Sequence, residues 1–220
     1  EQLFFYVTPD ISLNENRVSM DVAVSEFLDN ENKVMLLKGD SGSGKSLSLL
    51  NIQKIMLEKK RENPNIQTVI YIDLKRFNAE TVKKSLKKTL ETVYFQKEEQ
   101  LKNRDVLLLM DGYDEISGGF KENLYKIQNL STWSKLKVII TCRTQHLLDD
   151  NYKSWFIPEE IERFQECTIL PFNQNQITQY LKRYVEEGNR PYALNEYEEH
   201  IKNIPNLGGL ISNPLTLRQI

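Results

Sequence analysis

The sequence has little cysteine and little histidine. Its 220 residues include only two of each, Cys142 and Cys167, and His146 and His200. Two separated cysteines and two lone histidines do not form a ligand cluster, which argues against a zinc-type metal site. Both cysteines lie in apolar, strand-like stretches, and two buried thiols in a chain of this size indicate a reducing compartment, which we expect to be the cytoplasm.

The sequence also lacks a long apolar run, a signal peptide and an excess of either charge. No stretch approaches the length of a membrane-spanning helix. Lysine and arginine total 29 against 31 acidic residues, for a net charge of −2, so there is no basic footprint for nucleic acid. Hydrophobic content of 40% and charged content of 27% are ordinary for a globular domain. We therefore expect one main core, no membrane span and no nucleic-acid partner.

The stretch Val34–Leu50 reads VMLLKGDSGSGKSLSLL, an apolar run followed by a glycine-rich turn. It fits G-x-x-x-x-G-K-[ST], with Gly39, Gly44, Lys45 and Ser46 in the fixed places, which is the phosphate-binding P-loop or Walker A motif. The glycines let successive backbone N–H groups point at a polyphosphate, while the lysine supplies positive charge and the serine hydroxyl can ligate Mg²⁺. This pattern predicts a nucleotide site.

The alternative interpretation of this stretch is a glycine-rich hairpin turn. Val34–Leu37 reads as a buried strand, however, and Leu49, Ile52 and Met56 follow on one helical face, which is the strand–loop–helix frame that the motif needs. The residues predicted to contact the nucleotide from this loop are Gly39, Asp40, Ser41, Gly42, Ser43, Gly44, Lys45, Ser46 and Leu47.

A strand predicted over Asp105–Met110 ends in the acidic segment DGYDE. An apolar strand that runs into an aspartate carries a carboxylate to the carboxyl edge of a parallel sheet, where ligands of α/β sheets bind. We expect Asp111 to hold Mg²⁺ opposite Ser46 in a Walker B arrangement. Asp114 and Glu115 are predicted to orient or deprotonate a water molecule aimed at the γ-phosphate.

Three further strands are predicted over Thr68–Asp73, Leu136–Thr141 and Glu166–Leu170. The second of these is followed by Arg143, which would therefore lie near the phosphates; the alternative is a surface ion pair. A helix is predicted over Ala79–Tyr94, with its lysines on a solvated face rather than in a functional basic patch.

The two ends of the chain differ in sequence pattern from the strand-rich middle. Residues 1–18 predict an extended arm that packs on the core. From residue 173 onward the pattern predicts helices without strands, so we expect an α/β unit over residues 1–171 and the start of a truncated helical unit over residues 172–220.

Four segments together resemble the motifs of the NACHT domain, a branch of the STAND class of signalling P-loop NTPases. They are GDSGSGKS at 39–46, LLLMDGYDE at 107–115, VIITCRT at 138–144 and SNPL at 212–215. A small residue directly after the Mg²⁺ aspartate, here Gly112, followed by paired acids is a known feature of that family. The resemblance spans about residues 4–217.

The resemblance implies an α/β fold with a five-stranded parallel sheet in the order 5-1-4-3-2, flanked by helices and followed by a small helical subdomain that closes over the nucleotide. It implies that Asp114 and Glu115 are the hydrolytic pair, that Arg143 senses phosphate, and that Pro214 packs near the adenine. Such proteins are switches in defence or innate-immunity signalling: an ADP-bound form exchanges to ATP, forms a homo-oligomer and hydrolyses ATP slowly with Mg²⁺. A winged-helix domain and sensing repeats would lie beyond Ile220.

Two other functions fit the same motifs. One is a P-loop kinase or fast ATPase, although no basic lid is evident. The other is a module that holds ATP or ADP passively and oligomerises without hydrolysis, against which Asp114 and Glu115 argue. The absence of an NKxD guanine motif favours ATP over GTP.

Overall fold

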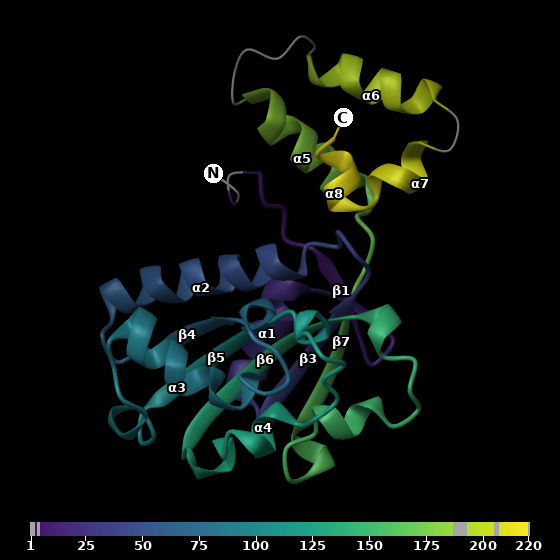
Figure 1. Cartoon of the computed structure of the whole chain (residues 1–220). Coiled ribbons are helices and arrows are strands. Elements are labelled where there is room, and N and C mark those ends of the chain that lie inside the picture. Colours follow the sequence, from purple (N-terminus) through teal and green to yellow (C-terminus); the bar gives the residue numbers. More distant parts are fainter. Residues whose placement is uncertain (1–2, 4, 187–192, 205–206, 220) are drawn as a thin grey trace.

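A seven-stranded sheet forms the centre of the structure, a computed structural model that describes residues 3, 5–186, 193–204 and 207–219 (Figure 1). Parts of the expected helical unit, residues 187–192, 205–206 and 220, lie outside the described residues. The strands are β1 (Asp10–Leu13), β2 (Asn16–Ser19), β3 (Val34–Gly39), β4 (Thr68–Asp73), β5 (Asp105–Asp111), β6 (Lys135–Arg143) and β7 (Phe164–Ile169).

The expectation of a five-stranded sheet is wrong, because the sheet has seven strands in the order β2-β1-β7-β3-β6-β5-β4. Strands β7, β3, β6, β5 and β4 are parallel neighbours. The two additional strands form an antiparallel hairpin that pairs with the outer edge of β7. The correction therefore adds a hairpin to one edge and leaves the parallel strands adjacent as β7-β3-β6-β5-β4.

The hairpin lies where the sequence predicts only an extended arm. Its tight turn is made by Asn14 and Glu15, which have φ of 49° and 67°. A two-residue turn of this kind favours glycine at its second position, and glutamate there hides the usual hairpin signal. The strands are also only four residues long, too short for a clear alternating pattern.

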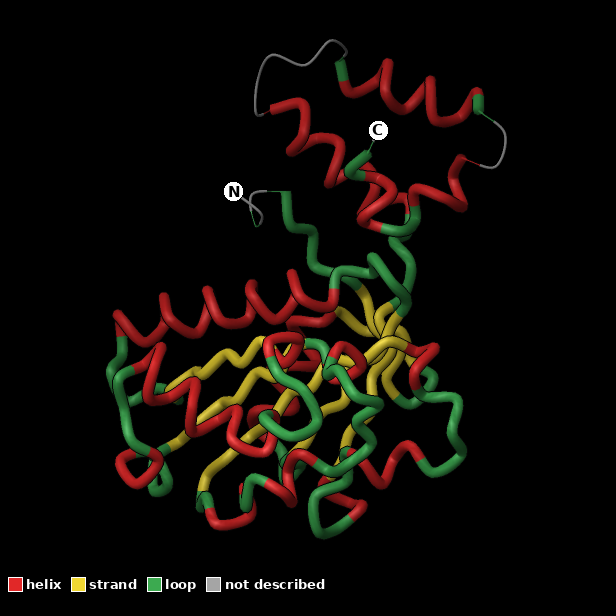
Figure 2. Tube along the Cα trace, in the orientation of Figure 1, coloured by secondary structure: helices red, strands yellow, loops and turns green. Residues whose placement is uncertain are grey.

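Helices pack on both faces of the sheet (Figures 1 and 2). The helices α1 (Met20–Asp29) and α2 (Lys45–Glu62) cover one face, where they bury Phe27, Leu49 and Ile52 against alternate strand residues. The shorter α3 (Ser85–Thr89) and α4 (Leu124–Ile127) contribute to a second cluster on the opposite face. Successive strand residues point to opposite faces, which is why the parallel strands are apolar throughout.

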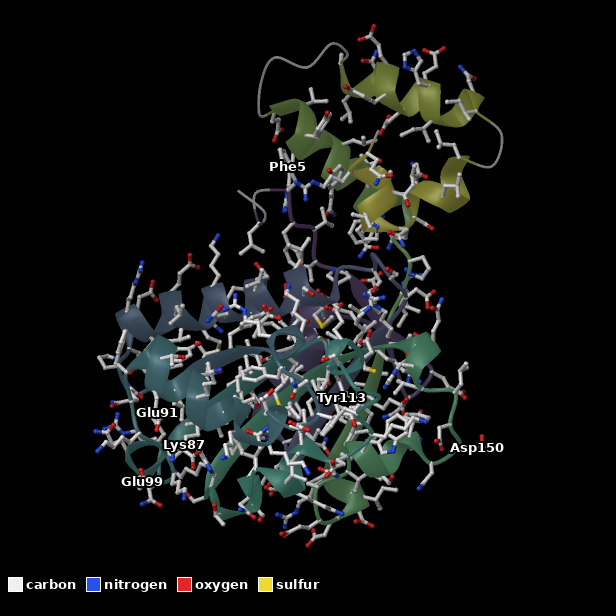
Figure 3. The ribbon with its side chains drawn as sticks, in the orientation of Figure 1. Phe5, Lys87, Glu91, Glu99, Tyr113 and Asp150 are labelled. Carbon is white, nitrogen blue, oxygen red and sulfur yellow. The ribbon has the colours of Figure 1, made fainter. Side chains whose placement is uncertain are left out.

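The single helix predicted over Ala79–Tyr94 is also wrong. This segment divides into a 3₁₀ turn at Val82–Lys84, α3, and a π-helical turn at Leu90–Tyr94. The Thr92 hydroxyl donates to the Lys88 carbonyl at 2.7 Å, a local bond that competes with regular helical bonding. Of the four residues predicted to form the apolar face, Val82, Leu86 and Leu90 are in the core, but Val93 is 57% exposed. Figure 3 shows Lys87 and Glu91 at the outer surface, as expected for a solvated face.

The last four helices form a separate group above the sheet (Figure 1). Their hydrophobic cluster joins Ile177, Leu181 and Ile211 to Phe172 and to Val7 of the N-terminal segment. Phe5 lies beside α5, against Tyr180 and Tyr184 (Figure 3). These helices are α5 (Gln174–Glu186), α6 (Leu194–Asn203), α7 (Leu207–Ile211) and α8 (Pro214–Leu217). The division into units at residue 171 stays a prediction.

The sequence also leads to expectations about the two cysteines and about the length of the helices. Cys142 and Cys167 are buried free thiols. Within the described ranges, no helix combines the length and apolarity needed to cross a bilayer.

The buried Lys137 ties β6 to the end of α1. Its ammonium group donates to the carbonyl oxygens of Phe27 at 2.8 Å, Asn32 at 2.7 Å, and Asn30. Burial lowers the pKa of this lysine. The last carbonyls of a helix have no partner within the helix, so this side chain stabilises the α1 terminus.

We expect Lys137→Met to lower the free energy of unfolding by about 2 kcal/mol, because buried carbonyl oxygens would lose their donor. The matched control is Lys135→Met on the same strand, where an exposed lysine pairs with Asp105 at 3.6 Å. That change should cost no more than about 0.5 kcal/mol. Chemical denaturation measures both, and equal losses would contradict the role of Lys137.

Candidate functional site

The predicted P-loop joins the end of β3 to the start of α2. Gly44 precedes the helix with φ of 94°, and Lys45 is the first helical residue. The first N–H groups of a helix have no partner within it and carry the positive end of the dipole, which favours bound anions. Lys45 Nζ donates to the carbonyl oxygens of Gly39 and Asp40, both at 2.8 Å, so its side chain lies over the loop.

The sheet brings three strand ends to this loop. Strand β6 pairs with β3 on one side and with β5 on the other, and Arg143 stands beside Gly39 in the register. Asp111 ends β5, and its charge and those of Asp114 and Arg143 all act on Lys45. Groups far apart in the sequence therefore gather at one edge of the sheet.

Asp111 is buried and held by hydroxyl groups from both neighbouring strands. Tyr71 of β4 donates to Oδ2 at 2.9 Å, and Thr141 of β6 donates to Oδ1 at 2.6 Å. The Thr141 hydroxyl also accepts from the Gly112 N–H at 2.7 Å. Gly112 has φ of 81°, a left-handed conformation that favours glycine and turns the chain after the strand.

Arg143 lies between the two predicted hydrolytic acids. Its Nε is 3.1 Å from Asp114 Oδ2, and its Nη2 is 2.9 Å from Glu115 Oε1. Its backbone N–H also donates to Asp114 at 2.9 Å. Arg143 is thus ion-paired and still half-exposed toward the site, with 43% of its side chain accessible.

Burial changes the pKa of several groups here. Desolvation lowers the pKa of Lys45, an effect opposed by the nearby Asp114 and reinforced by Arg143. Burial and the adjacent Asp111 charge raise the pKa of Tyr71 far above its usual range, so its hydroxyl remains a donor. Burial also raises the pKa of Tyr6 to about 12.

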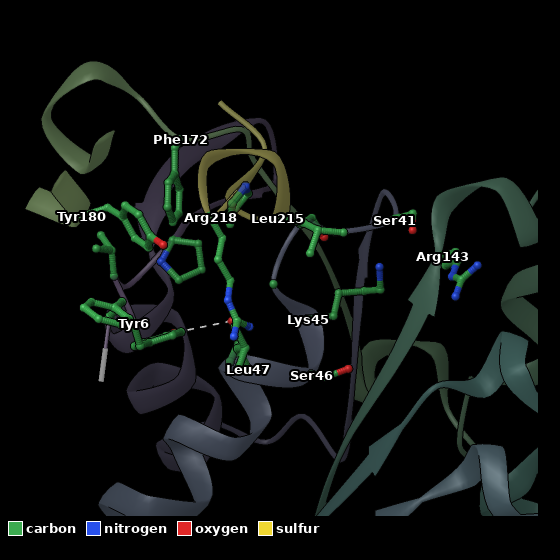
Figure 4. Close-up of a pocket in the computed structure, with 18 of the residues that line it drawn as sticks. Tyr6, Ser41, Lys45, Ser46, Leu47, Arg143, Phe172, Tyr180, Leu215 and Arg218 are labelled. Atoms are coloured by element: carbon green, nitrogen blue, oxygen red, sulfur yellow. Dashed lines mark hydrogen bonds between the residues drawn. The ribbon is translucent and has the colours of Figure 1, made fainter. Parts of the chain in front are cut away.

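A cavity of about 700 Å³ lies between the P-loop and the helical group (Figure 4), within the usual range for small-molecule sites. One end carries Lys45, Ser46 and Arg143, and the other carries aromatic and apolar side chains together with Arg218. The lining residues that were not predicted are Phe5, Tyr6, Val7, Pro9, Ser48, Phe172, Tyr180, Leu215 and Arg218. The cavity therefore differs in polarity between its two ends.

The helical group contacts the P-loop directly. Asn213 Nδ2 donates to the Ser41 carbonyl at 2.9 Å, and the Leu215 N–H donates to the Gly42 carbonyl at 3.3 Å. A Cβ on Gly42 would lie 2.7 Å from Asn213 Oδ1 and 2.8 Å from Leu215 Cβ. Only a glycine lets these segments approach so closely, and φ of 77° adds a second reason for glycine.

The structure distributes the predicted site residues unevenly around the cavity. Glu115 and Arg143 line it together with eight predicted nucleotide contacts, namely Ser41, Gly42, Ser43, Gly44, Lys45, Ser46, Leu47 and Pro214. Gly39, Asp40, Asp111 and Asp114 lie outside the lining. The roles of all these residues stay predictions.

Most of the residues that sequence reasoning missed come from segments without a motif; Asn213 and Leu215 are exceptions, since they lie within the SNPL segment at 212–215. Tyr6 and Phe172 flank the α/β unit, and Tyr71 looks like an ordinary strand residue. Asn213 could have been found, since an asparagine before a proline is a typical helix cap, and its side chain does accept from the Leu215 N–H.

The donor set is compatible with Mg²⁺. Among the residues that the structure describes, no group of three or more histidine, cysteine or acidic side chains is arranged for a metal. Mg²⁺ in nucleotide sites needs less than that, because it uses one or two carboxylates together with phosphate oxygens and water. Ser46 and the buried Asp111 supply oxygen donors of the right type.

Comparisons with known proteins agree with this geometry. A family model described as the NACHT domain matches residues 33–188, well over half of the chain. A search of curated proteins found no match.

Two solved structures share the fold at low sequence identity. The Walker-type ATPase PABY2304 of Pyrococcus abyssi is 18% identical with a TM-score of 0.55, over 95% of this chain and 69% of that one. A chain of Drosophila ORC bound to DNA is 12% identical with a TM-score of 0.57, over 90% of this chain and 51% of that one. This chain thus spans only about half to two thirds of those proteins. The chain belongs to the NACHT domain family of nucleotide-binding P-loop NTPases.

Proposed function

We propose that this domain is the ATP- and ADP-binding part of a signalling switch, in which slow hydrolysis controls nucleotide-dependent homo-oligomerisation. The proposal includes a cytoplasmic location and further domains of the same protein, a winged helix and sensing repeats. The observation that carries it is the contact of Asn213 and Leu215 with the P-loop, above the shared cavity. A bound nucleotide would touch both the loop and the helices, so its identity can bias their relative position.

The cavity chemistry supports a specific pose. The phosphates would lie against the P-loop N–H groups and Lys45, at the polar end. The base would lie at the apolar end, near Pro214, Phe172 and Tyr180. When bound, Mg²⁺ would supply positive charge beside the phosphate oxygens, and Ser46 and Asp111 would hold it.

The acids and the arginine support slow hydrolysis. Glu115 lines the cavity, and in this proposal it orients or deprotonates a water molecule beside the terminal phosphate. One of its oxygens accepts from Arg143, and Asp114 also accepts from Arg143. A terminal phosphate that competes for this guanidinium would free Glu115 for the water. Coupling the acid to such an exchange fits a switch better than a fast motor.

The two competing functions predict different rates of ATP hydrolysis and product release. A fast ATPase or kinase would release its product rapidly, whereas a passive module would not hydrolyse ATP at all. A switch should hold ADP, because product release has to await a signal.

We expect the purified domain to retain ADP, since the helical group covers the cavity and touches the loop. Mass analysis of nucleotide released by denaturation measures this directly. Retained ATP with no conversion over hours would favour the passive module. An empty site combined with many rapid turnovers would favour the fast enzyme and contradict the switch.

We expect Glu115→Gln to bind ATP normally but to slow hydrolysis at least tenfold, which is about 1.4 kcal/mol of lost transition-state stabilisation. Glutamine keeps the shape and can still accept from Arg143, but it cannot take a proton. Single-turnover hydrolysis and equilibrium binding are measured together, with Lys45→Ala as the binding-deficient comparison. Equal hydrolysis by Glu115→Gln and the unmodified domain would remove the catalytic assignment.

We expect Gly42→Ala to separate the helical group from the loop, because the new methyl group would overlap with Asn213 and Leu215. Amide exchange in α7 and α8 should accelerate about tenfold, equivalent to about 1.4 kcal/mol of local stability. Gly44→Ala is the matched control: it has the same left-handed strain, but a Cβ there meets no atom within 4 Å. Equal exchange in both variants would contradict the proposed coupling contact.

A further inference from the structure

We propose that Tyr71 is a positioning residue for the divalent cation, because its hydroxyl and that of Thr141 together fix the orientation of the Asp111 carboxylate. The inference rests on the proposed function, in which Asp111 helps to hold Mg²⁺ beside the nucleotide. Tyr71 lies on β4, outside the segments that carry the resemblance to NACHT motifs.

The strand pattern places the three side chains on one face of the sheet. Tyr71 packs into the cluster that contains Leu109 of β5 and Ile139 of β6, on the face that α2 covers. Asp111 and Thr141 each lie two residues further along those strands, so they point to the same face. Because α2 begins at the P-loop, this is the face toward the predicted cation ligand Ser46.

The hydrogen bonds hold the carboxylate from both sides. Each oxygen of Asp111 accepts one hydroxyl bond, from Tyr71 at 2.9 Å or from Thr141 at 2.6 Å. A carboxylate has about four acceptor positions, so a direction on each oxygen is left for a metal ion or its water. Groups that orient a metal ligand in this way commonly change metal affinity when they are removed.

Tyr71 is itself fixed in place. Its backbone N–H donates to the Tyr94 hydroxyl oxygen at 2.7 Å, and Gln53 of α2 donates to the same oxygen at 3.4 Å. The charge of Asp73, which pairs with Asp111 in the strand register, also acts on Tyr71; Asp73 Oδ2 is bound by Arg76 at 2.9 Å, whereas its buried Oδ1 has no hydrogen-bond partner. The Tyr71 hydroxyl donates to the carboxylate of Asp111 and not to that of Asp73.

The test is the Mg²⁺ dependence of ADP binding by Tyr71→Phe. This change keeps the ring and removes only the hydroxyl. We expect the apparent affinity for Mg²⁺, titrated at fixed ADP, to fall about tenfold, while the ADP affinity in EDTA stays at the unmodified value. Isothermal titration calorimetry measures both, and neither depends on hydrolysis. A merely structural hydroxyl would lower both affinities together or neither.

Tyr152→Phe is the matched control, because it removes a tyrosine hydroxyl that donates to a different carboxylate, Glu166 at 2.6 Å, without contacting Tyr71 or Asp111. It should leave the Mg²⁺ dependence unchanged. If Tyr71→Phe fails to fold, Thr141→Val removes the other hydroxyl donor and should weaken Mg²⁺ by a similar factor. An unchanged Mg²⁺ affinity in the folded variant overturns the positioning role while leaving the proposed function intact. No ADP binding by the unmodified domain would instead overturn the proposed function, and this inference with it.

Discussion

The position of β6 between β3 and β5 is the constraint on which the site depends. Backbone hydrogen bonds on both edges of β6 fix its register, so Arg143 comes to lie beside Gly39, and Thr141 bonds to Asp111. A shift of one residue would turn Thr141 to the opposite face and separate it from the carboxylate. The buried apolar residues before these strand ends resist such a shift, because it would expose or misplace the whole strand on both faces. The core therefore fixes the geometry of the polar edge.

This dependence explains which features could be predicted from the sequence. The parallel strands are continuous apolar runs, and the P-loop has fixed glycine positions, so both are visible locally. The hairpin of β1 and β2 was missed because its turn uses Asn14 and Glu15, and because its partner β7 lies more than a hundred residues away. Tyr71 was missed because its proposed role depends on a hydrogen bond to Asp111, which lies on another strand. Pairing between distant segments leaves no periodic signal in either one.

The charges of the site satisfy one another within the protein. Lys45 donates to two loop carbonyls, and Arg143 bonds to Asp114 and Glu115. A polyphosphate would offer both cations stronger acceptors, since hydrogen bonds between ionised groups are the stronger ones. Its arrival would also leave the two acids without their shared partner. In the proposed function, phosphate binding and the freeing of the acids would thus be coupled through the same guanidinium.

The packing of the helical group determines which contacts would break if the helices moved relative to the sheet. Its hydrophobic cluster is built from its own helices and the N-terminal segment, separately from the two clusters of the sheet. The Tyr6 hydroxyl bonds to Ser48 of α2 at 3.4 Å, and Arg183 of α5 bonds to the Tyr6 carbonyl. Moving the helices would break the polar contacts at Gly42 and Tyr6 and two more to the N-terminal segment, from Asn173 to Asp10 at 3.1 Å and from Gln176 to Thr8 at 2.9 Å, while neither sheet cluster has to open. In the proposed switch, a nucleotide in the cavity would contact the same loop and helices and so bias their relative position.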